Sequence, residues 1–154
     1  MSISEALVGK VEALTHDRII RRALALHRRG EVRRDGLEPS KVSTRLEIQW
    51  HARDVHPWDR NLGPERKARL FVEQSIDDAE AAIRRLFAGL PHVEALDVSV
   101  LGPDDAILLG GTVHRSSLDT SASLESPRMR LRELGLGGQV FDNESMLSIY
   151  RRAS

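Results

Sequence analysis

The chain contains no cysteine, and this absence excludes several kinds of chemistry. Without thiols there can be no disulfide bond, no cysteine nucleophile and no zinc site built from thiolates. The sequence also lacks an apolar run of about 18 residues, the length typical of a membrane-spanning helix. Its N-terminus has no basic region followed by a continuous apolar core, as a secretory signal would have. We therefore expect a cytoplasmic protein.

Neither sign of charge is in excess, and lysine is scarce. The 23 basic side chains equal the 23 acidic ones in number, and only Lys10, Lys41 and Lys67 are lysines. A neutral total argues against a protein whose whole surface binds nucleic acid, but it leaves room for a local basic patch. Arginine, which supplies the other positive charges, has a planar fork suited to carboxylates and phosphates. Abundant arginine and alanine also fit a GC-rich genome, so we expect a bacterial source.

A length of 154 residues fits one ordinary domain. Composition divides the chain into three parts. Residues 1–30 are predicted to form an amphipathic helical arm, residues 31–43 a polar linker or loop, and residues 44–154 an α+β core domain.

The predicted arm has its positive charges on one side. Ser2 and Glu5 form a capping box at its start, and Gly30 ends it. In its second half, arginines gather on one sector and Ile and Leu on the opposite one. These arginines are Arg18, Arg21, Arg22, Arg28 and Arg29. Such a face could bind phosphates, pair with an acidic surface of a partner or of another copy, or simply be a solvated outer face.

The segment 44–61 contains both tryptophans. Leu46, Ile48 and Trp50 alternate with polar residues, which predicts a strand with one buried face and places Trp50 in the core. Pro57 cannot donate to a sheet, so we expect the strand to end in a loop before it. Trp58 lies in that loop, where its indole could either cover the edge of the sheet or, if exposed, anchor a partner.

The remainder of the core is predicted as a helix, two strands and C-terminal helices. The helix begins at Pro64 and ends at Gly89. The strands lie within 92–101 and 106–114, and Ile107, Leu109 and Val113 are expected to share a face. The Gly110-Gly111 pair predicts a bulge or a close approach of another backbone.

A short helix is predicted from Pro127 to Gly135. Residues 139–152 fit either a strand or a helix, and the helix is preferred because Asp142 or Asn143 could cap it. The resulting fold is a small mixed sheet of three or four strands with a β-α-β-β core and helices on one face, in the α+β class.

One candidate for chemistry is the set His51, His56 and Asp59. Two imidazoles and a carboxylate could bind zinc, manganese or iron and leave positions for water, which the metal could activate for hydrolysis. The alternative is structural, with His56-Pro57-Trp58 anchoring the loop and Asp59 or Asn61 capping the next helix. A second set, His114 with Ser116, Ser117 and Asp119, has the residue types of a nucleophilic site. It lacks a glycine-flanked serine elbow, which favours a structural role.

The preferred interpretation is a non-enzymatic binding or assembly module. The Arg-rich helix and the Trp58 loop would engage a partner protein, another copy of the chain or nucleic acid, and a protein partner or self-association is preferred. No cofactor and no small-molecule ligand are predicted. The alternative is a metal-dependent hydrolase or nuclease that uses His51, His56 and Asp59 with a divalent ion.

Overall fold

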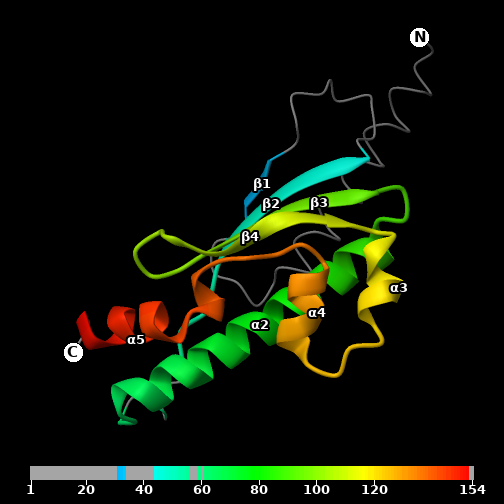
Figure 1. Ribbon diagram of the computed structural model, residues 1–154. Coiled ribbons are helices and arrows are strands. Elements are labelled where there is room, and N and C mark those ends of the chain that lie inside the picture. Colours follow the sequence, from blue (N-terminus) through cyan, green and yellow to red (C-terminus); the bar gives the residue numbers. More distant parts are fainter. Residues whose placement is uncertain (1–30, 34–43, 56–58, 60, 153–154) are drawn as a thin grey trace, which may run out of the picture.

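A computed structural model describes residues 31–33, 44–55, 59 and 61–152 (Figure 1). The predicted arm, most of the predicted linker, His56 and Trp58 lie outside this range. The strands are β1 (Glu31–Arg33), β2 (Arg45–His51), β3 (Ala95–Leu101) and β4 (Ile107–His114). The helices are α2 (Pro64–Gly89), α3 (Ser117–Ser121), α4 (Pro127–Glu133), the 3-10 turn η2 (Gln139–Phe141) and α5 (Asn143–Arg152).

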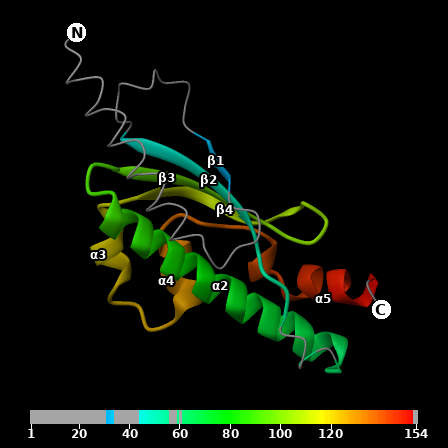
Figure 2. The same ribbon diagram turned by 180° about the vertical axis from the view of Figure 1, so that it is seen from behind.

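The strands form one mixed sheet in the order β1-β2-β3-β4. β2 and β3 are parallel, whereas β1 pairs with β2 and β4 with β3 in antiparallel fashion. The described helices cover one face of this sheet (Figures 1 and 2). The predicted α+β class is therefore confirmed. β1 lies inside the segment predicted as linker. The sequence does not indicate this strand, because three residues, one valine between Glu31 and Arg33, are too few to show a period of two.

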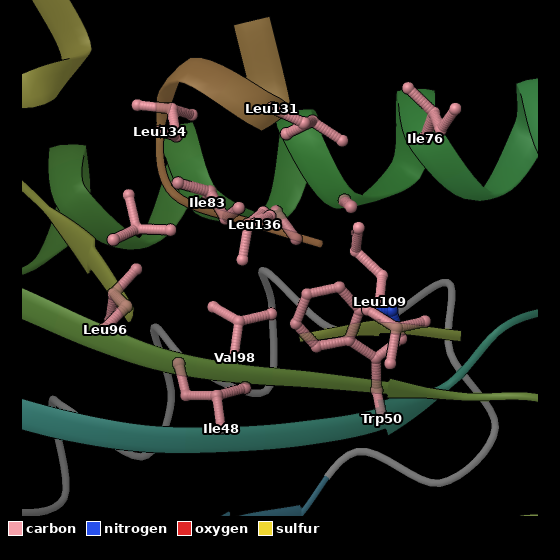
Figure 3. Close-up of a cluster of buried hydrophobic side chains, with 14 of the residues drawn as sticks. Ile48, Trp50, Ile76, Ile83, Leu96, Val98, Leu109, Leu131, Leu134 and Leu136 are labelled. Carbon is pink, nitrogen blue, oxygen red and sulfur yellow. The ribbon is translucent and has the colours of Figure 1, made fainter. Parts of the chain in front are cut away.

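The core lies between the sheet and α2 (Figure 3). Leu46, Ile48 and Trp50 of β2 are buried, as their alternation predicts, and Trp50 is 0% exposed. The buried stripe of α2 includes Phe71 and Ile83. Burial of each large apolar side chain contributes about 1.5–3 kcal/mol, so this contact dominates the stability of the fold.

The predicted apolar face of β4 is wrong at its first residue. Leu109 and Val113 are buried, but Ile107 is 56% exposed and Leu108 is fully buried instead. The reason is a bulge, since Val100 pairs with Leu109 while the next residue, Leu101, pairs with Ile107. Because Leu108 is the extra residue, the alternation of β4 changes phase there.

The segment after α4 packs closely along the outer edge of β4. Gly110 and Gly137 exchange two backbone hydrogen bonds of 2.8 and 3.0 Å. A Cβ on Gly111 would lie 2.5 Å from the carbonyl oxygen of Gly135. The close backbone approach predicted for the glycine pair is thus present. The preference for a helix in the tail is also confirmed, because Asp142 Oδ1 accepts from the backbone N–H of Glu144 at the start of α5.

Candidate functional site

The described part of the predicted site lies at the carboxyl end of β2. Because β2 and β3 are parallel and in register, the turn between β3 and β4 lies beside the end of β2. His51 therefore meets Asp105 of that turn, with 2.6 Å between Nε2 and Oδ1. The imidazole is 24% exposed and the carboxylate 74% exposed. The result is a histidine–aspartate pair at the rim of the sheet.

The second nitrogen of His51 faces inward. Nδ1 is buried and has no hydrogen-bond partner within the described part of the chain. A general base needs a lone pair that the substrate can reach, and a metal ligand needs one that the ion can reach. In this arrangement Nε2 is engaged by Asp105 and Nδ1 is covered, so the pair joins the turn to β2.

The turn itself adopts an unusual backbone conformation. Asp105 has a φ of 58°, a region in which Asp is among the better tolerated non-glycine residues. Its N–H donates to the carbonyl of Gly102, and the N–H of Gly102 donates to the carbonyl of Ala106. The turn is thus held by its own backbone as well as by His51.

Residues just after His51 are tied to α2. Arg53 donates to both oxygens of Asp78, at 2.7 and 3.1 Å. The side-chain amide of Gln74 donates to the carbonyls of Arg53 and Asp54. The chain that leads toward Trp58 therefore leaves the sheet along α2.

Tyr150 of α5 lies near the same segment. Burial raises the pKa of its phenol, and the negative charge of Asp54 raises it further, so the group stays neutral across the physiological range. Its ring packs edge-on against Phe71, with 5.7 Å between centroids. This contact joins α5 to the core.

The structure describes two of the three predicted metal ligands. His51 is engaged with Asp105, His56 lies outside the described residues, and Asp59 is placed in a turn in which its carbonyl accepts from Leu62. Within the described ranges, no group of three His, Asp or Glu residues could hold a metal ion. The metal site remains a prediction. The same is true of Trp58 and of the arginines Arg18, Arg21, Arg22, Arg28 and Arg29.

The segment that follows β4 has a structural role at Arg115. Its guanidinium donates to the carbonyls of Val93 and Leu90, at 2.8 and 2.6 Å, and lies 4.8 Å from the ring centroid of Phe87. It therefore ties the end of β4 to the turn that follows α2. His114 beside it is exposed, and Ser117 and Asp119 belong to the short helix α3.

The face of the sheet opposite the helices carries a polar network that sequence reasoning missed. Arg45 donates to both oxygens of Asp97, at 2.6 and 2.8 Å, and the hydroxyl of Thr112 donates to the same carboxylate at 2.6 Å. The hydrogen bond from Arg45 lowers the pKa of Asp97, while partial burial opposes the shift. The network spans β2, β3 and β4, so finding it requires the strand register.

Comparison with protein-family models, curated proteins and solved structures gave no match for this chain. Among the described helices, none combines the length and apolar character needed to cross a membrane.

Proposed function

We propose that this protein is a non-enzymatic binding or assembly module. Its Arg-rich N-terminal segment and its Trp58 loop act together on a partner protein or on a second copy of the chain. The proposal combines the arginine distribution in residues 18–29 with the topology of the described sheet.

The observation that carries the proposal is the register of β1. Glu31 pairs with Gln49 and Arg33 with Glu47, so β1 runs antiparallel to β2. Glu31, the first residue of β1, therefore lies next to the end of β2 from which residues 52–55 lead toward Trp58. This register supports the proposal, because the start of β1 and the end of β2 lie at the same end of the sheet.

The experiment compares a charge-reversal variant and a tryptophan variant with the unmodified protein. Arg18, Arg22 and Arg29 are replaced together by Glu, and Trp58 is replaced by Ala in a separate variant. Molar mass is measured by light scattering across protein concentration and salt, and binding of duplex and single-stranded DNA and RNA is titrated over the same salt series. Removal of several ionic contacts is expected to weaken association at least tenfold at low salt.

The matched control reverses three exposed arginines of α2, namely Arg66, Arg84 and Arg85. It introduces the same change in net charge outside the predicted arm and the Trp58 loop, and it should leave association unchanged. Equal effects of both triple variants, or no effect of either, would overturn the proposal. Binding to nucleic acid alone would redirect it to that partner. Stoichiometric metal that is lost in His51→Ala would instead support the hydrolase alternative.

A further inference from the structure

A hollow of about 250 Å³ lies between the first half of α2 and the start of α5. α5 runs alongside α2 there in both views of the ribbon (Figures 1 and 2). Its lining residues come from three helices, namely Glu65, Ala68, Arg69, Val72 and Glu73 of α2, Arg128 of α4, and Asn143, Met146 and Leu147 of α5. The volume lies just below the range of about 300–1,000 Å³ that drug-sized ligands occupy, so it suits a smaller molecule.

The lining includes apolar residues that are well buried. Ala68 and Val72 of α2 and Met146 of α5 are 6%, 4% and 0% exposed. They are members of the helix stripes by which α2 and α5 face the core. Leu147 of α5 is only partly buried and is the apolar lining residue that a ligand can reach. Covering its exposed surface favours binding roughly in proportion to the area covered.

The lining also carries charges that lack a partner in the described part of the chain. Arg69, Arg128 and Glu73 make neither an ion pair nor a hydrogen bond through their side chains there. Arg69 stands four residues from Glu73, a spacing at which such pairs commonly form on a helix. Glu65 instead approaches Arg151 of α5, at 4.0 Å. Two guanidinium groups and one carboxylate are thus available to a ligand.

The negative charge of Glu73 is not isolated. Burial raises the pKa of nearby Asp77, and the carboxylates of Glu80, Asp78 and Glu73 raise it further. Arg130 opposes this shift. The carboxylate of Glu73, which lines the hollow, would attract a positive ligand group. The two arginines offer the opposite charge, in the planar form that suits a carboxylate.

We propose that this hollow, which we call the α2–α5 groove, binds a free amino acid with an apolar side chain. The α-carboxylate is held by Arg69 and Arg128, the ammonium by Glu73, and the side chain packs on Leu147. This extends beyond the sequence analysis, which predicts no small-molecule ligand. It is independent of the arm and of Trp58, so the two proposals can fail separately.

The test is a titration of the full-length protein followed by amide NMR shifts. Leucine, methionine and valine are added up to about 10 mM, a range that reaches weak binding. Saturable shifts confined to residues 65–73, 128 and 143–147 are expected. N-acetyl-leucine, which lacks the ammonium, and leucinamide, which lacks the carboxylate, should each bind at least tenfold more weakly than leucine.

Arg128→Ala and Glu73→Gln provide the protein side of the test. Each should weaken leucine binding at least fivefold. Arg85 is an exposed arginine of α2 outside the groove, so Arg85→Ala should leave leucine binding unchanged. Absence of saturable shifts would overturn the proposal. So would equal binding of either blocked analogue, since the groove would then not recognise a zwitterion. Equal binding by all three protein variants would do the same, because the groove charges would then play no part.

Discussion

At the scale of single residues, two neighbouring glycines have very different surroundings. Gly138 has a φ of 144°, and a Cβ there would lie 2.3 Å from the carbonyl oxygen of Leu108. Gly137 has nothing within 4 Å of the same position, although it pairs with Gly110 through its backbone. Only Gly138 therefore requires the absence of a side chain.

Gly138→Ala should destabilise the protein by about 2 kcal/mol or more, because both the φ angle and the clash with backbone are unfavourable. Gly137→Ala should change stability by about 0.5 kcal/mol or less. Urea unfolding followed by circular dichroism measures both. Similar losses for the two variants would show that the segment is not held against β4 as described.

Some residue-level features could be predicted from the chain and others could not. The close approach at Gly110-Gly111 was predictable, since paired glycines inside a strand leave room for another backbone. The partner of His51 was not predictable from local pattern, because Asp105 reaches it only through the parallel register of β2 and β3. The exposure of Ile107 depends on a bulge at Leu108, whereas the glycine pair that predicts a bulge lies at Gly110 and Gly111.

At the scale of elements, one ion pair fastens α4 to α2. Arg130 donates to both oxygens of Glu80, at 2.6 and 2.9 Å, and to the carbonyls of Leu124 and Glu125. The hydrogen bond from Arg130 lowers the pKa of Glu80, and partial burial opposes the shift. One guanidinium thus holds both the loop that enters α4 and the long helix beneath it.

Glu80→Gln should cost about 1.5–3 kcal/mol at neutral pH, the usual range for a hydrogen bond to a charged group. Because the pKa of Glu80 is lowered by folding, its contribution is complete above its ordinary value of 4.5 and is lost as the pH falls through the folded value. The stability difference between the variant and the unmodified protein should therefore shrink in acid. Urea unfolding at several pH values between about 3 and 7 measures it.

Arg84 provides the control for this prediction. It approaches the same Glu80 carboxylate at 4.0 Å and is 46% exposed, so Arg84→Ala should cost less than about 0.5 kcal/mol. A loss as large as that of Glu80→Gln would mean that charge alone, and not the bidentate geometry, stabilises this contact.

Elements themselves were more predictable than the contacts between them. The apolar stripe of α2 and its limits at Pro64 and Gly89 follow from periodicity and helix-end signals. The roles of Arg115 and Arg130 do not, because each joins segments that lie far apart in the sequence.

At the scale of the whole molecule, the described core is one continuous cluster between Leu46 and Met146. A fragment of residues 31–154 keeps all of these side chains together with β1. We expect it to unfold in one cooperative transition with the same midpoint, within a few degrees, as the full chain. Calorimetry of both forms is the measurement, and a broad or absent transition in the fragment would show that residues 1–30 are needed for folding.

The hydrogen bonds between Gly110 and Gly137 also bear on aggregation. They lie in the middle of the outer edge of β4, where an incoming strand would otherwise form backbone hydrogen bonds. The bridge therefore opposes the addition of another strand at this edge of the sheet. If copies of this protein join strand to strand, the addition is directed to the opposite border, beside β1. A two-fold pairing through β1 of both copies would close the assembly as a dimer, because the β4 edge of each copy could not add a further strand.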